Sequence, residues 1–209
     1  LAYPIDGTLA DGRGGDTSRQ HTDNRTGVLM VLIIAMMTLA FVYMLQHGNW
    51  QLLVTNRYLS NESKSHLLPL VLLAGVGAGI GALVSIVVGV KLSLPAEQLF
   101  ALIGMAILIA VSAIFMHHAL MSWLKAYGLL ISLGFIVIYV IALGQLFDTY
   151  YGNVSPVLAY LTPFVPAENM LHAVINQQPT AWISTAAISV IGVIGFVGSM
   201  LHYQQHNKE

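Results

Sequence analysis

Five stretches of this chain contain no Asp, Glu, Lys or Arg, and each is long enough to consider as a membrane-crossing helix. They cover residues 27–46, 67–90, 98–116, 126–147 and 181–201. A helix of roughly 20 residues crosses a hydrocarbon core of about 30 Å. Only 8% of the residues are charged, and the mean hydropathy is +0.75, whereas a soluble domain is about 25% charged. We therefore predict an all-α, polytopic membrane helix bundle with five spans. The bundle is expected to contact the lipid bilayer.

The segments at the two ends of the chain are short and polar. Residues 1–26 alternate arginines with aspartates and are nearly neutral, so we expect a mobile external linker or the tail of a further domain. Leu1 is not a methionine and no signal peptide is recognisable, so we expect sequence upstream of it. Residues 27–202 form the predicted transmembrane domain, and residues 203–209 a cytoplasmic tail.

The orientation of the bundle follows from Lys and Arg in the short loops. The basic residues divide four against four, because Lys91 shares its side with three arginines, and the opposite side has Arg57, Lys64, Lys125 and Lys208. Aspartates balance the three arginines, and residues 148–180 contain no Lys or Arg. We therefore predict that the N-terminus and residues 148–180 lie outside, and that the loop with Arg57 and Lys64 is cytoplasmic.

Residues 148–180 contain four of the seven prolines and predict a short external helix pair, residues 155–176, before the last span. An N-cap serine followed by proline favours the start of the first helix. Two prolines then interrupt it, and a carboxylate in the first turn of the second helix favours the helix dipole. We interpret that carboxylate as solvated at the membrane interface. The residues concerned are Ser155, Pro156, Pro163, Pro166 and Glu168.

The second span contains a series of small residues at four-residue spacings. In lipid, such residues let two helix backbones approach closely. We therefore predict that this helix is tightly packed, either at the centre of the bundle or at a dimer seam. The residues are Gly75, Gly77, Gly79, Gly81, Ser85 and Gly89.

Several kinds of chemistry have no candidate residues in the sequence. The chain has no cysteine and a net charge of -1, which argues against thiolate catalysis and a nucleic-acid partner. It contains no Walker A, serine-elbow or His-Glu-x-x-His motif. His117 and His118 are adjacent, so they point about 100° apart on a helix and have no evident third ligand. We expect no enzyme activity, cofactor or metal.

The proline-rich segment resembles the C-terminal region of ABC-type-2 membrane permeases, and more closely that of their phage-infection-protein (YhgE/Pip) relatives. The resemblance rests on Leu161-Thr162-Pro163-Phe164-Val165-Pro166, which follows Ser155-Pro156 and precedes the final span. Residues 94–100 and 112–115, with Leu120 and Gly128, are similar to that family's middle spans. Two features of the family are replaced, its Gly-Gly turn by residues 149–153 and an aromatic residue by Ala167-Glu168-Asn169.

The resemblance implies an export permease in a bacterial cell membrane, built as a homodimer or heterodimer. A separate ATPase subunit would dock on the cytoplasmic side marked by Arg57 and Lys64, and residues 155–176 would gate the outer mouth. The alternative is a non-transporting membrane anchor of a large external domain. That anchor would serve as a phage receptor or as an accessory protein of a type VII-like secretion machine.

Overall fold

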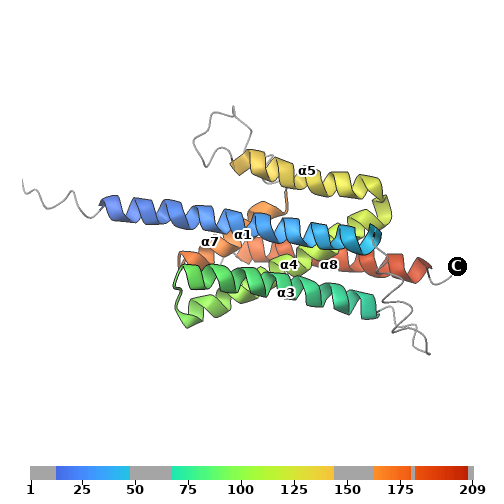
Figure 1. Ribbon diagram of the computed structural model, residues 1–209, viewed down its shortest axis with the longest axis horizontal. Coiled ribbons are helices and arrows are strands. Elements are labelled where there is room, and N and C mark those ends of the chain that lie inside the picture. Colours follow the sequence, from blue (N-terminus) through green and yellow to red (C-terminus); the bar gives the residue numbers. More distant parts are fainter. Residues whose placement is uncertain (1–12, 48–66, 144–161, 180–181, 207–209) are drawn as a thin grey trace, which may run out of the picture.

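Helix α4 (Ala96–Leu124) is the central element of the bundle, because it packs against all of the other described helices. The computed structural model describes residues 13–47, 67–143, 162–179 and 182–206, and these residues form helices with no strand among them. The all-α prediction is therefore confirmed. The other helices are α1 (Arg13–His47), α3 (Leu67–Lys91), α5 (Ala126–Leu143), α7 (Phe164–Ile175) and α8 (Trp182–His206) (Figure 1).

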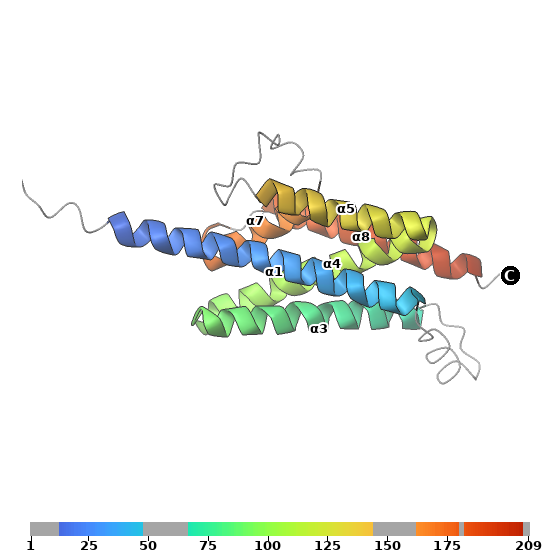
Figure 2. The same ribbon diagram turned by 45° about the horizontal axis from the view of Figure 1, so that its top comes forward.

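The long helices alternate in direction along the bundle (Figures 1 and 2). Helices α1, α4 and α8 run one way, and α3 and α5 run back. The connection from α4 to α5 therefore lies at the end where α1 and α8 finish, on the right in Figure 1. We refer to this as the α4–α5 end. At the α3–α4 end, on the left, α3 connects to α4, α7 finishes and α8 begins.

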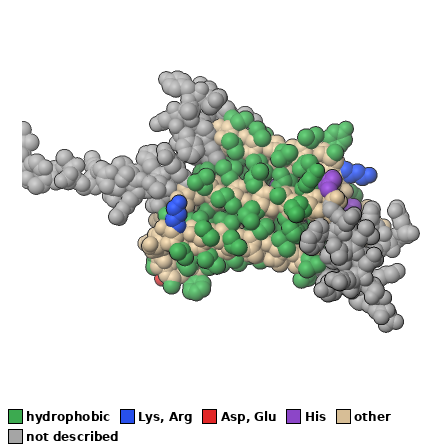
Figure 3. Space-filling model, in the orientation of Figure 1, with side chains coloured by type: hydrophobic (Ala, Val, Ile, Leu, Met, Phe, Trp, Pro, Cys, Tyr) green, Lys and Arg blue, Asp and Glu red, His purple; other side chains and the backbone are tan. Residues whose placement is uncertain are grey.

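Among the described residues, four helices are long and apolar enough to cross a membrane, over Thr26–His47, Pro69–Lys91, Ala96–Leu124 and Trp182–Gln205. The third of these continues eight residues beyond the predicted end at residue 116. The helix expected to be another span, α5, has 18 described residues, or about 27 Å at 1.5 Å per residue. Residues 144–147 of that prediction lie outside the described residues. Figure 3 shows hydrophobic side chains spread over the face of the bundle, with lysine side chains at its two ends.

Helix α1 differs from the prediction at its beginning. Residues 1–26 were expected to form a mobile linker, but the helix begins at Arg13 and continues without a break into the span that starts at Thr26. Its first turns project beyond the ends of the other helices (Figures 1 and 2). The polar turns and the apolar span are thus one helix, which extends from inside the bundle to beyond its end. Residues 1–12 lie outside the described part.

Helix α7 is re-entrant: it begins halfway along the bundle and ends at the α3–α4 end (Figures 1 and 2). It packs against α1, α4, α5 and α8. Half of its 12 residues are buried, namely Phe164, Ala167, Met170, Leu171, Ala173 and Ile175. The second half of the predicted helix pair is thus a single helix packed against other helices of the bundle. The first half of the pair, with Ser155 and Pro156, lies outside the described residues.

Pro163 and Pro166 both lie at the beginning of α7, and the helix that they were expected to interrupt, residues 155–161, lies outside the described residues. Pro163 is the N-cap and Pro166 is the third helical residue, so Glu168 lies beyond the first turn. The first four N–H groups of a helix have no acceptor within it. Proline has no N–H, so two of the four orphan donors are absent at this buried helix end. Fewer unpaired N–H donors suit a helix that begins among apolar side chains, where an unpaired donor is costly.

Replacing Pro166 with alanine is expected to lower the free energy of unfolding by about 1–3 kcal/mol, because it adds an N–H without a helical acceptor at a half-buried position. Thermal or denaturant unfolding of the purified protein in a mild detergent measures this difference. The matched control is Pro95→Ala, at the exposed N-cap of α4, where water can accept from the added N–H. Equal effects of the two substitutions would contradict this explanation.

Half of the predicted series of small residues lies between α3 and α4. A Cβ atom built on Gly77 would lie 3.0 Å from the Cα of Val111, and one built on Gly81 would lie 2.5 Å from the carbonyl oxygen of Ala106. Ser85 is buried and donates a hydrogen bond to the Gly81 carbonyl at 2.7 Å. Gly89 lies against Leu99 at the start of α4. By contrast, Cβ atoms built on Gly75 and Gly79 would meet nothing within 4 Å.

A second series of small residues, which the sequence reasoning missed, joins α8 to α4. A Cβ atom on Gly192 would lie 2.5 Å from the Oγ of Ser112, and one on Gly195 would lie 2.7 Å from the backbone nitrogen of Met116. Gly198 accepts a hydrogen bond at its carbonyl from the Trp123 indole, at 2.9 Å. Helix α4 is therefore held closely on two sides, by α3 and by α8.

Candidate functional site

The carboxylate of Glu168 lies inside the bundle, where three helices meet. Its side chain is 14% exposed. One carboxylate oxygen, Oε2, accepts a hydrogen bond from the hydroxyl of Tyr139 at 2.8 Å, and the other, Oε1, lies 3.2 Å from Nε2 of His172. Tyr139 comes from α5 and is fully buried, whereas Glu168 and His172 are both on α7. The expected solvated interfacial carboxylate is instead a partner of two other side chains.

The local geometry of the site follows from helix spacing. Glu168 and His172 are four residues apart on α7, which places their side chains on the same face of the helix. Tyr139 approaches from α5, and its ring also contacts that of Phe164, with centroids 5.6 Å apart. An ionisable side chain inside a membrane bundle is costly and marks a candidate functional site. Among the side chains that the structure describes, Glu97 and Glu168 are the only acidic ones, and Glu97 is exposed.

His172 has one ring nitrogen without a partner. When Nε2 donates to Glu168, Nδ1 is left as a hydrogen-bond acceptor, and this atom is buried without a hydrogen bond. A buried polar atom left unpaired costs about 1–3 kcal/mol. The ring also lies against the backbone of α1, because a Cβ atom built on Gly27 would lie 2.9 Å from Cε1 of His172. Gly27 thus provides the space that His172 occupies.

A second polar cluster joins α4 to α8. His118 contacts the Oγ of Ser199 through Nδ1 at 2.9 Å, and its Nε2 lies 3.1 Å from the hydroxyl of Tyr203. The His118 and Tyr203 rings are stacked, with centroids 5.4 Å apart. A serine–histidine pair at this distance is also the arrangement of an activated nucleophile. Ser199 is 0% exposed, however, so the pair acts in this structure as a bond between helices.

The neighbouring His117 is fully buried, and neither of its ring nitrogens has a hydrogen-bond partner. His117 and His118 both lie within the length of α4. Within the described ranges, no group of three or more His, Cys, Asp or Glu side chains is arranged to hold a metal ion.

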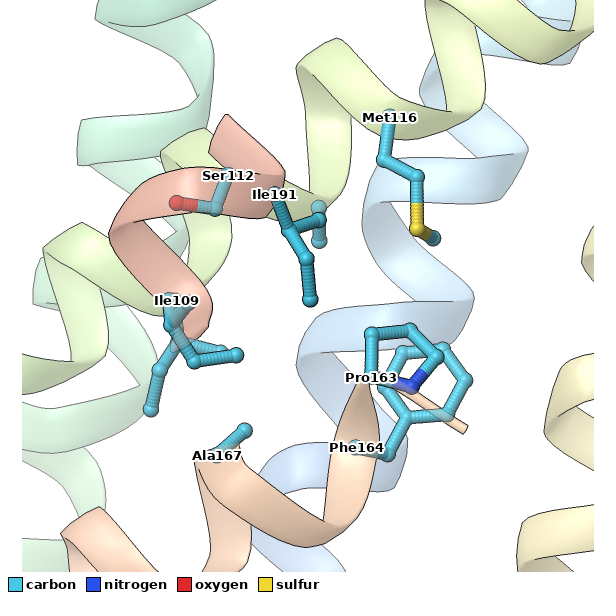
Figure 4. A pocket seen from close by; sticks show the side chains of 9 residues that line it. Ile109, Ser112, Met116, Pro163, Phe164, Ala167 and Ile191 are labelled. Atoms are coloured by element: carbon cyan, nitrogen blue, oxygen red, sulfur yellow. The ribbon is translucent and has the colours of Figure 1, made fainter. Parts of the chain in front are cut away.

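A small apolar cavity lies beside the beginning of α7 (Figure 4). It is bounded by α4, α7 and α8, and its volume is about 10 Å³, which is the lower limit for one water molecule. In Figure 4, Met116, Pro163 and Phe164 lie on one side of it, and Ile109 and Ala167 on another. Ser112 and Ile191 also line it. A cavity of this size and lining does not form a path for a polar substrate.

The structure brings together only part of the predicted site. Pro163, Pro166 and Glu168 share one helix, whereas Ser155, Pro156, Arg57 and Lys64 lie outside the described residues. Sequence reasoning missed Tyr139, His172 and Gly27. The spacing of Glu168 and His172 was an available signal, because residues four apart on a helix are neighbours. Tyr139 precedes Glu168 by 29 residues and gave no comparable signal.

These observations define an all-helical membrane protein with several spans, a re-entrant helix and a buried carboxylate at a helix junction. The family model described as the EsaA helical domain matches residues 23–200, which is most of the chain. The chain therefore belongs to the EsaA helical domain family, which is associated with type VII secretion. The match supports a membrane protein of that kind and gives no support to the ABC-type-2 assignment in particular. No curated protein and no solved structure matches the chain.

Proposed function

We propose that this chain is an accessory subunit of a type VII-like secretion machine in a bacterial cell membrane. In this proposal it anchors other parts of the machine and does not itself conduct a substrate. The observation that carries the proposal is the family match over residues 23–200. The match begins in the polar turns of α1 and ends in α8, so it includes all of the spans together with the re-entrant helix.

The length of α1 supports an anchoring role. Its 35 residues extend about 52 Å as a continuous helix, whereas the hydrocarbon core is about 30 Å thick. The polar turns that begin at Arg13 therefore extend beyond the apolar part of the bundle. A continuous helix holds an extramembrane contact at a fixed orientation, which a flexible linker would not do.

An anchor also agrees with the contacts that α7 makes inside the described bundle. The cavity beside α7 has a volume of about 10 Å³, close to the limit for a single water molecule. The carboxylate of Glu168 is paired with Tyr139 and His172, so it is not presented to an open path. A permease of the ABC-type-2 kind needs a route that admits its substrate and an ATPase subunit that drives it.

Affinity purification of the full-length protein from its own membranes, in lipid nanodiscs, tests the proposal. We expect mass spectrometry to recover type VII secretion components, and we expect deletion of the gene to reduce type VII substrate secretion. The charge-reversed variants Arg19→Glu and Arg25→Glu in the polar part of α1 should recover less of the machine. Lys91→Glu, at the same end of the bundle, is the matched control. Unchanged secretion together with a stoichiometric ATP-binding-cassette ATPase would overturn the proposal and favour the permease.

A further inference from the structure

Three helices are joined at Glu168, and each contributes a different kind of contact. Helix α5 contributes the Tyr139 hydroxyl, which donates to Oε2 at 2.8 Å. Helix α7 contributes His172, whose Nε2 lies 3.2 Å from Oε1. Helix α1 contributes its backbone at Gly27, which lies against the His172 ring. Hydrogen bonds therefore connect α5 to α7, and a van der Waals contact connects α7 to α1.

The contact between Gly27 and His172 leaves no spare room. A Cβ atom built on Gly27 would lie 2.9, 3.1 and 3.2 Å from Cε1, Nδ1 and Nε2 of His172. The flanking residue Val28 is itself buried. A rotation or a shift of α1 by one residue would bring a side chain to the position of Gly27, and the His172 ring would have to move.

Moving the His172 ring out of this position could give its Nδ1 a hydrogen-bond partner. Its Nδ1 is buried without a partner, and a buried unpaired polar atom is unfavourable. Only 16% of the side chain is exposed, so the ring is held by packing and by its contact with Glu168. Release from Gly27 would let Nδ1 find a partner but would disturb the contact of Nε2 with Glu168. Movement of the His172 ring would therefore exchange its contact with Glu168 for a possible partner at Nδ1.

We propose that Gly27 and His172 couple the position of α1 to that of the re-entrant helix α7, with Glu168 and Tyr139 as the latch between α7 and α5. Movement of the polar turns of α1 displaces His172, weakens its contact with Glu168 and changes how α7 sits in the bundle. This inference rests on the proposed function, because an anchored partner would act on those polar turns. It adds that the anchor transmits a displacement to the interior of the bundle.

The test is a distance measurement in the purified protein, reconstituted in nanodiscs. The chain has no cysteine, so no native cysteine has to be replaced before labelling. Spin labels can be placed at Gln178→Cys, just after α7, and at Ala96→Cys, at the start of α4. Both positions are exposed. We expect Gly27→Ala to shift the mean distance between the labels by about 1–2 Å or to broaden its distribution, as for small helix shifts. Tyr139→Phe should broaden the distribution as well, because it opens the latch.

Two further variants make the measurement decisive. Gly104→Ala on α4 is the control, because a Cβ atom there would meet nothing within 4 Å, and it should leave the distance unchanged. In a His172→Ala background, Gly27→Ala should no longer shift the distance, because the atoms it displaces are absent. The coupling is overturned if Gly27→Ala has no effect, or if its effect persists without His172. Thermal unfolding of each variant identifies any that is simply misfolded, and a folded His172→Ala background still decides the question.

The outcomes also separate this inference from the function on which it rests. The distance measurement uses the isolated protein and no secretion component. A shift with Gly27→Ala combined with failure to recover the secretion machine would reject the proposed function and leave the coupling intact. Recovery of the machine without any shift would reject the coupling alone.

Discussion

Replacing Gly81 with leucine should prevent α3 from packing against α4. A Cβ atom at this position would lie 2.5 Å from the carbonyl oxygen of Ala106 and 2.7 Å from the Cα of Ile107. These are backbone atoms of the central helix, so no side-chain rotation can make room. Overpacking usually costs about 1–3 kcal/mol and occasionally more, and we expect the upper part of this range or loss of the folded bundle. Thermal unfolding and size-exclusion chromatography in detergent measure the effect.

The chain provides a matched control on the same helix. Gly79 is two residues from Gly81, and a Cβ atom there would meet nothing within 4 Å. Gly79→Leu should therefore leave the unfolding temperature nearly unchanged, although it makes the same change of residue in the same span. If Gly79→Leu were as damaging as Gly81→Leu, the loss would reflect helix insertion and not the contact with α4.

Replacing Glu168 with alanine should cause the second large loss of stability. It removes the acceptor of the Tyr139 hydroxyl and of His172 Nε2 and leaves a space where the side chain stood. Buried donors that lose their acceptor cost about 1–3 kcal/mol each, and removal of the carboxylate relieves part of its own desolvation cost. We expect a net decrease of about 2–4 kcal/mol in the free energy of unfolding, measured by denaturant titration in mixed micelles.

Glutamine at the same position separates hydrogen bonding from charge. Its amide oxygen can accept from Tyr139, and its amide nitrogen can donate to His172 if the imidazole adopts its other tautomer. Glu168→Gln should therefore retain most of the stability that Glu168→Ala loses. Glu97→Gln, at an exposed position of α4, controls for the loss of a carboxylate as such. A loss with glutamine as large as with alanine would show that the negative charge itself is required.

The series of small residues illustrates how far the sequence determines the packing. Four-residue spacing places Gly77 and Gly81 on one face of a helix, and it does the same for Gly75 and Gly79. The two pairs are separated by two residues, or about 200° around the helix. Spacing alone therefore predicts that the helix can pack closely but not which face does so. That choice depends on where α4 lies, and it is settled only by the tertiary structure.

The position of the proline-rich segment could be predicted less completely from the sequence, for a different physical reason. Proline favours the start of a helix, and Pro163 is the N-cap of α7. The prolines did not indicate how deeply the helix lies within the bundle. An apolar face on a helix of 12 residues can be covered by lipid or by other helices, and the sequence pattern is the same in both cases. Glu168 consequently looked like a surface carboxylate, and its partner on α5 lay too far away in the sequence to be identified.

The place of α7 has a consequence for the order in which the protein is assembled in the membrane. Its 12 residues form about 18 Å of helix, too short to be inserted as a span, and they include a carboxylate that lipid does not solvate. The surfaces that cover it come from α1, α4, α5 and α8, and α8 is made after α7. We therefore expect α7 to reach its final position only once the last span is in the membrane. The burial of α7 is then the step that completes the bundle. In a chain that ends before Trp182, α7 would lack the surface that α8 provides.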